Sequence, residues 1–253
     1  MNIAVCGVGR AGKELARKVI SEGNINLSMA LCRDTSKSAE KDIGELLDMP
    51  KQGIVIYKLS EAVKKLTEKK VDVVIDFSAR ETSLKLAEIC QKAGVNLVIC
   101  TTNFSEEEIE HLKIIGSSKK LGLVYAPNLT LGINLLMEFV AKLSKILPEF
   151  DFEIVERHRR DKPRVTTTAK LISKAIARGE TPISSVRTGG YVGVHEVTAA
   201  SEEERITIEH ESFSRQAFAK GALLAAEFVK EKKGFFEMKD VIAALEEKIE
   251  KKD

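Results

Sequence analysis

Short apolar runs alternate with amphipathic segments through the first half of the chain. The runs are rich in Val and Ile and are bounded by polar residues or Gly, which is typical of buried strands. They are Ile3–Cys6, Leu27–Cys32, Ile54–Tyr57, Val73–Phe77, Leu97–Cys100 and Leu121–Ala126. Helical periodicity covers the segments between them, namely Ala11–Ser21, Ser60–Glu68, Glu81–Ala93 and Glu106–Ile115, the last with Ser105 and Glu108 placed as a capping box. This alternation predicts an α/β fold with a doubly wound parallel sheet.

The pattern changes after about Pro127, where longer helices and alternating strands predict a smaller α+β domain. We expect helices over Gly132–Leu147, Thr167–Arg178 (closed by Gly179), Gln216–Lys230 and Lys239–Lys252. We expect an antiparallel sheet from Phe152–Glu156, Val186–Ala199 (bent at Gly189-Gly190) and Arg205–His210. The predicted domains are residues 1–127 plus 216–253, which bind a dinucleotide, and residues 128–215, which bind substrate and form a tetramer.

Charge and composition exclude several classes of protein. The 40 Lys and Arg residues exceed the 38 Asp and Glu residues by so little that a dedicated nucleic-acid binder is not expected. No apolar stretch approaches the roughly 20 residues that span a bilayer, and the chain begins in a strand without a basic leader. The four cysteines are scattered without a CxxC pair, so we expect reduced thiols and no structural zinc. These features predict a cytoplasmic protein without membrane or nucleic-acid partners and without a bound metal.

A glycine-rich turn follows the first predicted strand directly and opens the first predicted helix. Its residues are Gly7, Val8, Gly9, Arg10, Ala11 and Gly12. In a Rossmann-like domain the first glycine allows a tight turn, the second lets a pyrophosphate approach the backbone, and the third allows close helix–strand packing. A tight turn without a ligand is the alternative, but the strand before the turn and the helix after it favour dinucleotide binding.

The end of the second predicted strand bears on which dinucleotide is bound. An NAD-selective site places Asp or Glu there to accept from the ribose 2′-hydroxyl. This chain has Cys32-Arg33-Asp34, in which Arg33 is suited to pair with a 2′-phosphate and Asp34 remains within possible reach of the ribose. We therefore expect NADPH as the preferred cofactor, with NADH as a possible second one. A solvated surface arginine is the alternative for Arg33.

A polar cluster over residues 156–164 follows an apolar strand, and its cations repel one another unless an anion lies among them. A solvated basic loop is the alternative interpretation. The hydroxyl-rich segment Val165-Thr166-Thr167-Thr168 comes next, however, and free N–H groups at a helix start bind carboxylates. Lys162 and this turn are suited to a small dicarboxylate, and His158 is the nearby group that exchanges protons near neutral pH. We interpret His195 and His210 as strand residues and His111 as a helix-surface residue.

Several motifs in one order resemble the 4-hydroxy-tetrahydrodipicolinate reductase (dihydrodipicolinate reductase) family nearly end to end. After the glycine turn they are Val73-Val74-Ile75-Asp76-Phe77-Ser78, Thr101-Thr102, Ala126-Pro127-Asn128 through Asn134, Glu156-x-His158 with Lys162, Arg187-x-Gly189-x-x-x-Gly193-x-His195, Ser214-Arg215-x-x-Phe218, and Gly234-Phe235-Phe236-Glu237. The resemblance implies NAD(P)H-dependent reduction of a cyclic imine dicarboxylate to tetrahydrodipicolinate, in lysine and diaminopimelate biosynthesis. It also implies a homotetramer whose substrate domains form a shared sheet.

The resemblance also assigns roles to residues of this chain. His158 and Lys162 match the family's proton-handling pair. The expected cofactor-binding residues are the glycine turn, Arg33, Phe77, Ser78, Thr101, Thr102, Ala126 and Asn128. The expected substrate-binding residues are Arg159, Thr167, Thr168 and Arg215.

Three departures from the family pattern lie in the expected site. Arg159 replaces the second of two adjacent histidines, and Asn103 replaces the last glycine of a Gly-Thr-Thr-Gly loop. Residues 164–168 replace an Asp-Ala-Pro-Ser-Gly-Thr loop and are one residue shorter. They motivate a second hypothesis, a related reductase or dehydrogenase acting on another imino or amino acid such as L-aspartate. A redox-sensing NADP-binding protein without turnover is a third, although His158 and Lys162 are both present.

Overall fold

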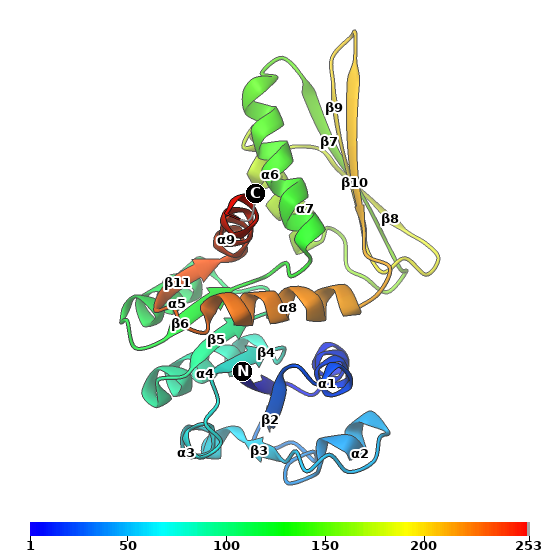
Figure 1. The fold of residues 1–253 in the computed structure, drawn as a ribbon. Coiled ribbons are helices and arrows are strands. Elements are labelled where there is room, and N and C mark those ends of the chain that lie inside the picture. The colour runs from blue at the N-terminus through cyan, green and yellow to red at the C-terminus, as the bar shows by residue number, and fades with distance from the viewer. Residues whose placement is uncertain (252–253) are drawn as a thin grey trace. The chain divides into compact units, whose positions relative to one another are not determined.

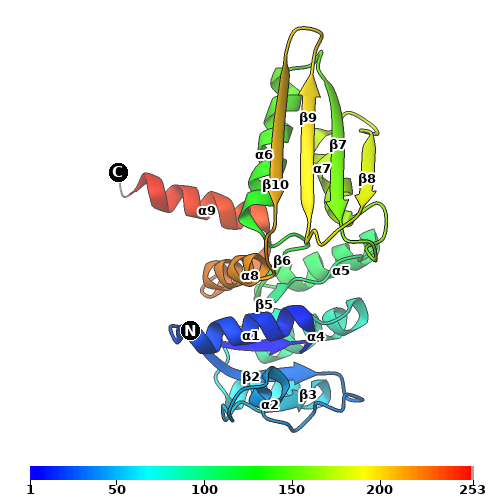
Figure 2. The same ribbon diagram turned by 90° about the vertical axis from the view of Figure 1, so that its right-hand side faces the viewer.

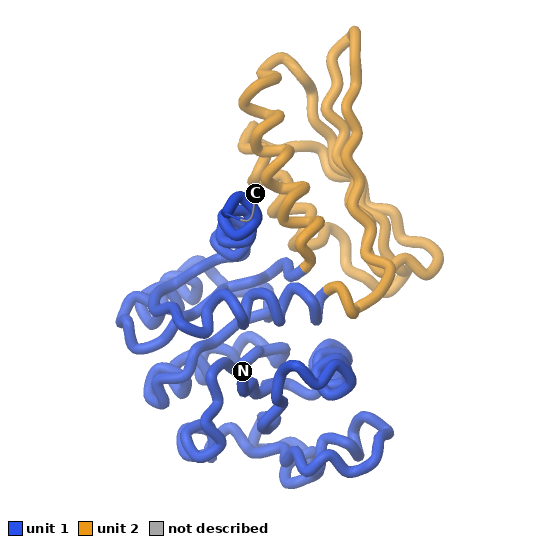
Figure 3. Tube along the Cα trace, viewed as in Figure 1, with its two compact units in different colours: residues 1–129, 218–253 blue, residues 130–217 orange. Residues whose placement is uncertain are grey.

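The chain forms two compact units in a computed structural model that describes residues 1–251 (Figure 3). Unit 1 combines Met1–Leu129 with the chain from Phe218 onward, and unit 2 is Thr130–Ala217. Unit 2 is thus inserted between a long N-terminal stretch of unit 1 and its final elements. Each unit has its own sheet.

The sheet of unit 1 contains, among the described residues, seven parallel strands in the order β11-β6-β5-β4-β1-β2-β3. The strands are β1 (Asn2–Cys6), β2 (Asn26–Cys32), β3 (Ile56–Lys58), β4 (Val73–Asp76), β5 (Asn96–Ile99), β6 (Gly122–Tyr125) and β11 (Gly234–Glu237). The order reverses between β1 and β4, as in doubly wound dinucleotide-binding sheets. The predicted α/β fold with a Rossmann-like parallel sheet is confirmed.

Helices cover both faces of this sheet (Figure 1). The helices of unit 1 are α1 (Arg10–Glu22), α2 (Ile43–Leu47), α3 (Ala62–Glu68, preceded by the 3₁₀ turn Leu59–Glu61), α4 (Arg80–Ala93), α5 (Glu106–Ser117), α8 (Gln216–Val229) and α9 (Met238–Glu250). The helices α3, α4 and α5 share one apolar core with alternate residues of the strands. On the other face, α1 packs against Val5 and α8 against Gly122. The predicted capping box of Ser105 and Glu108 is present at the start of α5.

The turn after β1 requires two of its three glycines for packing. Gly7 has φ = 87°, and a Cβ there would lie 2.7 Å from the backbone of Phe77 after β4. A Cβ on Gly12 would lie 1.9 Å from the carbonyl oxygen of Gly7. By contrast, a Cβ on Gly9, the N-cap of α1, would meet no atom within 4 Å. The turn therefore holds α1 close to the sheet and leaves open space at Gly9.

Unit 2 is a mixed sheet with two helices on one face (Figures 1 and 2). Its elements are α6 (Leu131–Ile146), β7 (Asp151–His158), α7 (Thr167–Ile176), β8 (Ile183–Arg187), β9 (Val194–Ala200) and β10 (Arg205–Glu211), with the strands in the order β10-β9-β7-β8. Phe152 and Ile154 of β7 point into an apolar core with Val140 of α6 and Ile172 of α7. The core lies between the helices and the sheet.

Several predicted details of the elements are wrong. The sheet of unit 2 is mixed, because β8 runs parallel to β7 after the crossover through α7. The segment predicted as one bent strand, Val186–Ala199, contains the end of β8, a turn and most of β9. Helix α7 ends at Ile176, and Ala177 rather than Gly179 is its left-handed C-cap. The short helix α2 and the edge strand β11 were not predicted, and Lys252 of the last predicted helix lies outside the described residues.

The glycine turn generates a stability prediction. Gly12→Ala forces a methyl group against the Gly7 carbonyl, so the free energy of unfolding should fall by about 1–3 kcal/mol or more. Gly9→Ala is the matched control, because its methyl group meets only open space, and its unfolding midpoint in urea should stay near that of the unaltered chain. Equal unfolding midpoints for the two variants would contradict this packing.

Candidate functional site

The carboxyl ends of β1 and β4 bring the predicted cofactor residues of unit 1 together. Gly7 donates its N–H to Leu31 at the end of β2 (3.0 Å), and Phe77 donates to Cys6 at the end of β1 (2.8 Å). Ser78 follows Phe77 beside Gly7. In doubly wound sheets, ligands bind where the strand order reverses, because the loops diverge there and leave a crevice. The glycine turn and Phe77-Ser78 lie at this point.

A buried carboxylate, Asp76, organises the neighbouring loops. Its side chain has no exposed surface and accepts hydrogen bonds from the Ser78 N–H (3.0 Å) and the Ser83 hydroxyl. The Thr101 hydroxyl lies 3.0 Å from that of Ser83 and 3.5 Å from Asp76 Oδ2. Burial raises the pKa of Asp76, and the hydrogen bonds only partly offset that effect. Asp76 and Ser83 therefore hold Thr101, a predicted cofactor residue, although neither was predicted as a site residue.

The two residues after β2 have different surroundings. Asp34 accepts a hydrogen bond from the Ser60 N–H at 2.9 Å, which lowers the pKa of its carboxyl group. Its carboxylate is thus engaged at the start of the turn before α3. Arg33 is exposed, and its guanidinium forms no ion pair within residues 1–251. Arg33 is therefore the cation available to a ligand at this strand end.

The loop after β5 carries one of the departures from the family pattern. Asn103 has φ = 68°, a left-handed conformation that glycine adopts most easily and Asn better than most other residues. A positive φ at this position is therefore compatible with Asn as well as with glycine. Thr102 before it is partly buried, and Ala126 after β6 is fully buried, with its N–H bonded to Ile99 (2.8 Å).

A buried polar cluster of unit 2 begins on β7. Alternate residues of this strand face the helices, and the apolar series Phe152 and Ile154 continues with Glu156 and His158. Strand pairing places Ser185 of β8 and His195 of β9 on either side of Glu156. All these side chains share one face because directly paired residues project to the same side of a sheet. The buried face thus changes from apolar to polar at the carboxyl end of β7.

Glu156 is fully buried and its two oxygens accept several hydrogen bonds. Oε1 accepts from Ser185 (2.7 Å) and from Arg187 Nη2 (2.5 Å). Oε2 accepts from the N–H (3.1 Å) and the hydroxyl of Thr166, the N-cap of α7. Burial by itself raises the pKa of Glu156, but the hydrogen bonds from Ser185, Thr166 and Arg187 outweigh it and lower the pKa to about 2. Glu156 is therefore ionised at neutral pH.

His158 and His195 lie beside this carboxylate with their rings edge to face, 5.1 Å between centroids. The His158 Nδ1 lies 3.3 Å from the Val192 carbonyl oxygen, which only accepts, so Nδ1 carries the proton of the neutral ring. Its Nε2 is buried and has no hydrogen-bond partner within the described chain. Burial lowers the pKa of His158, and Glu156 acts in the opposite direction. His158 therefore presents a bare ring nitrogen.

His195 is a structural member of the cluster at neutral pH. Burial, reinforced by the charge of His158, lowers the pKa of His195 to about 3. Its Nε2 lies 3.3 Å from the Thr166 hydroxyl oxygen and 3.9 Å from Glu156. Because the ring is neutral at pH 7, the contact with Glu156 is a contact of a dipole with a charge and not an ion pair. The expectation that His195 is an ordinary strand residue missed this network.

The other predicted residues of unit 2 occupy different environments. Lys162 is exposed and forms no ion pair within residues 1–251. Arg159 is half-exposed and pairs with Asp161 at 2.7 Å. Thr167 and Thr168 form the first turn of α7, and Arg215 is partly buried before α8. The structure thus places Lys162, Thr167 and Thr168 on the segments that follow His158.

Glu156, His158 and His195 also have the composition of a metal site, with ligand atoms within 4.8 Å of one another. The contacts of Glu156 oppose this role. Its oxygens already accept from two hydroxyls, a backbone N–H and the Arg187 guanidinium. A metal ion would have to displace that guanidinium, which already neutralises the carboxylate.

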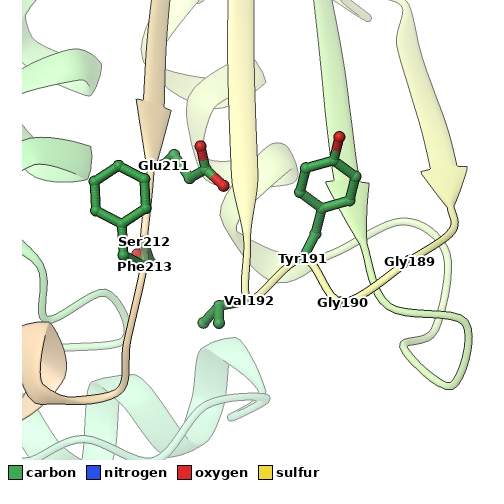
Figure 4. Close-up of a pocket in the computed structure, with 7 residues that line it drawn as sticks. All are labelled: Gly189, Gly190, Tyr191, Val192, Glu211, Ser212 and Phe213. Atoms are coloured by element: carbon green, nitrogen blue, oxygen red, sulfur yellow. The ribbon is translucent and has the colours of Figure 1, made fainter.

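A hollow of about 410 Å³ adjoins the backbone that holds His158 (Figure 4). Its lining comes from the turn before β9 and the end of β10, namely Gly189, Gly190, Tyr191, Val192, Glu211, Ser212 and Phe213. Val192 accepts from the His158 ring, and Tyr191 accepts from the Arg159 N–H (3.2 Å). A Cβ on the following Gly193 would lie 2.9 Å from His158 Cε1. This turn therefore fixes one side of the imidazole.

Glu156, Ser185 and Arg187 were not predicted as site residues. A signal for Glu156 was present, because a charged residue continues the buried alternation of β7. Its donors Ser185 and Arg187 lie 29 and 31 residues away along the chain, and no local pattern indicates them.

No helix within residues 1–251 is long and apolar enough to cross a membrane.

Comparisons with known proteins agree along nearly the whole chain. The family model "Dihydrodipicolinate reductase, N-terminus" matches residues 1–129, and its C-terminal counterpart matches residues 132–242. The 4-hydroxy-tetrahydrodipicolinate reductases of Methanopyrus kandleri and Methylococcus capsulatus are each 36% identical to this chain. The first alignment covers 96% of both chains, and the second covers 94% of this chain and 96% of the relative.

Solved structures show the same relationship. A dipicolinate-bound dihydrodipicolinate reductase from Paenisporosarcina sp. TG-14 superposes with a TM-score of 0.78 at 25% identity, over 94% of this chain and 97% of that one. An amine dehydrogenase from Mycobacterium smegmatis shares the fold, with a TM-score of 0.69 at 13% identity over 93% and 94% of the two chains. The matching N- and C-terminal family models, together with relatives above 30% identity over nearly the full length, show that the chain belongs to the dihydrodipicolinate reductase family.

Proposed function

We propose that this protein reduces 4-hydroxy-tetrahydrodipicolinate, by way of dihydrodipicolinate, to tetrahydrodipicolinate with NAD(P)H. The observation that carries the proposal is the state of His158, whose Nδ1 is held by Val192 while its buried Nε2 has no partner within the described chain. The names of the relatives support the same reaction. The place of this reaction is lysine and diaminopimelate biosynthesis.

The glycine turn fits a dinucleotide. Neighbouring backbone occupies the space beside Gly7 and Gly12, whereas the space beside Gly9 is open. Gly9 is the N-cap of α1, and no side chain caps the helix there. Free N–H groups and the helix dipole favour a pyrophosphate at such a position. Phe77, Ser78, Thr101, Thr102, Ala126 and Asn128 are the proposed neighbours of the nicotinamide half. When bound, the cofactor supplies a hydride from its C4 to the unsaturated ring of the substrate.

The residues of unit 2 supply the proton and hold the substrate. His158 Nε2 is the atom at which we place the proton, because Nδ1 is occupied and proton transfer needs an available ring nitrogen. Lys162, whose ammonium has no ion pair within residues 1–251, provides a positive charge for a substrate carboxylate and for charge that develops in the reaction. Thr167 and Thr168 lie at the positive end of α7, which favours the second carboxylate. Arg159 and Arg215 are the proposed additional cations.

The proposed roles of His158 and Lys162 are tested by two single variants, His158→Gln and Lys162→Ala. Aspartate semialdehyde and pyruvate, fed through the upstream synthase, supply the substrate, and NADPH oxidation is followed by absorbance. Each variant should lower kcat by about 10²–10⁴-fold, the usual contribution of positioned proton transfer. The Kd for NADPH should stay within about twofold.

Lys92→Ala serves as a charge-matched control. Lys92 is exposed in the last turn of α4, near the amino ends of the strands of unit 1 and away from their carboxyl ends, where the glycine turn lies. Undiminished turnover in both site variants would sink the assignment. Tight NADPH binding by the unaltered chain without synthase-dependent oxidation, and no inhibition by millimolar pyridine-2,6-dicarboxylate, would favour another imino or amino acid.

NADPH is the proposed preferred cofactor, with NADH as a weaker one. Support comes from the strand end after β2, where Asp34 is engaged by Ser60 and Arg33 is without an ion pair among the described residues. Arg33→Ala should lower the ratio of kcat/KM for NADPH to that for NADH by about tenfold, which corresponds to one lost charge contact. Lys92→Ala should leave the ratio unchanged. A ratio near or below one in the unaltered chain would contradict the preference.

A homotetramer in the cytoplasm is the proposed state of the protein. Support comes from unit 2, where most strand side chains on the sheet face turned away from α6 and α7 are half-buried or exposed. Arg157 joins Glu196 (3.0 Å) and Glu209 (3.6 Å) on that face, and Val186 is 39% exposed there. Light scattering should give the mass of four chains, and Val186→Glu should reduce that mass. A monomer at micromolar concentration would exclude the tetramer; cell fractionation tests the compartment.

A further inference from the structure

Arg187 makes an unusual set of contacts for a strand residue. It ends β8, lies opposite His158 in the parallel pair with β7, and its side chain is only 5% exposed. Nε donates to the Lys162 carbonyl (2.8 Å), and Nη2 donates to the Pro163 carbonyl (2.6 Å) and to Glu156 (2.5 Å). Nη1 donates to the carbonyl of Val186 (2.9 Å). One planar group thus joins β7, β8 and the segment that carries Lys162.

We propose that Arg187, anchored by Glu156, is a positioning residue for the reaction: it fixes the backbone of Lys162-Pro163 and thereby places the Lys162 ammonium beside His158. This inference rests on the proposed function for its catalytic consequence. The contacts of Arg187 with the segment do not depend on that function.

The location of these contacts indicates why the segment needs an external support. Residues 159–166 connect β7 to α7, and their own backbone bonds include the turn from the Lys162 N–H to Arg159 (3.1 Å). At its start the segment is held by the turn before β9, where the Arg159 N–H donates to the Tyr191 carbonyl (3.2 Å) next to the contact of His158 with Val192. At its end the Thr166 N–H donates to Glu156 (3.1 Å). Arg187 adds two bonds in the middle, at Lys162 and Pro163. Removing them frees the part of the segment from which Lys162 projects.

Lysine cannot reproduce this arrangement. Arg187 uses three nitrogens in one plane to reach a carboxylate and three carbonyls. A lysine ammonium keeps the charge opposite Glu156 but is a single nitrogen, which cannot span the same acceptors. Arg187→Lys therefore separates loss of the carbonyl contacts from loss of the positive charge.

The chain contains a matched control in the same unit. Arg178, which is partly buried, likewise donates to backbone carbonyls, at Leu147 (2.7 Å), Pro148 (2.8 Å) and Phe150 (2.9 Å). These carbonyls belong to the end of α6 and the segment before β7, at the opposite end of that strand from His158. Arg178→Lys removes a comparable set of bonds without touching residues 159–166.

The first measurement is steady-state kinetics together with thermal unfolding. Arg187→Lys should lower kcat at least tenfold while the Kd for NADPH, which is bound by unit 1, stays within twofold. Arg178→Lys should lower the unfolding temperature by a similar amount and keep kcat within twofold. Equal effects of the two substitutions on kcat would mean that Arg187 acts only through stability, and would overturn the proposal.

The second measurement does not require turnover. Amide hydrogen exchange of residues 159–166 should become at least tenfold faster in Arg187→Lys and remain unchanged in Arg178→Lys. Unchanged exchange of this segment in Arg187→Lys would overturn the positioning role. If the unaltered protein did not oxidise NADPH with the proposed substrate, the proposed function would fail, while this comparison would still decide whether Arg187 holds the segment.

Glu156→Gln provides a second variant in case Arg187→Lys does not fold. The charged and titratable groups facing His158 are Glu156 on its own strand, Arg187 on β8, His195 on β9 and Lys162 on the following segment. Removing the negative charge disfavours the imidazolium, so the His158 limb of the pH–rate profile should move to lower pH by roughly one unit. An unshifted limb with unchanged exchange of residues 159–166 would overturn the role of Glu156 as anchor.

Discussion

Glu156 has no exposed surface, and its two oxygens accept hydrogen bonds from β8 and from the start of α7. A carboxylate removed from water in this way requires a cation and fixed dipoles around it, since an unpaired buried charge costs several kcal/mol. Arg187, Ser185 and Thr166 meet that requirement. Ser185 and Arg187 belong to β8, Thr166 caps α7, and Arg187 also donates to the segment between β7 and α7. Satisfying one charge therefore also sets the positions of β8, α7 and that segment.

A second buried carboxylate, Asp76, has the opposite electrostatic outcome in unit 1. Its carboxylate accepts hydrogen bonds from the Ser78 N–H and from hydroxyl groups, and no arginine donates to it among the described residues. Burial therefore raises the pKa of Asp76, whereas the donors around Glu156 lower its pKa to about 2. Both carboxylates follow the same structural logic, in that each lies at the carboxyl end of a strand and orders the loops that the proposed ligands contact.

Two departures from the family pattern have physical explanations in the structure. Asn103 adopts a left-handed backbone conformation, which glycine takes most easily and Asn takes better than most other residues, so this position of the loop after β5 accepts Asn. Arg159 pairs with Asp161 at the end of β7, which provides a partner for the cation that replaces a histidine. The hydroxyl-rich turn at residues 166–168 begins α7, with Thr166 as its N-cap.

Patterns local in sequence predicted six of the seven strands of the parallel sheet, the capping box at Ser105, the glycine turn and the candidate residues His158 and Lys162. Such features depend on periodicity and on residues within one turn of each other, which sequence displays directly. Only the tertiary structure decided the parallel pairing of β8 with β7, the edge position of β11 and the end of α7 at Ile176 with Ala177 as C-cap. It also decided the role of Arg187, whose partners Glu156 and Lys162 are 31 and 25 residues away along the chain. Contacts at such separations arise from the burial of one charge by several elements, and no short stretch of sequence contains that information.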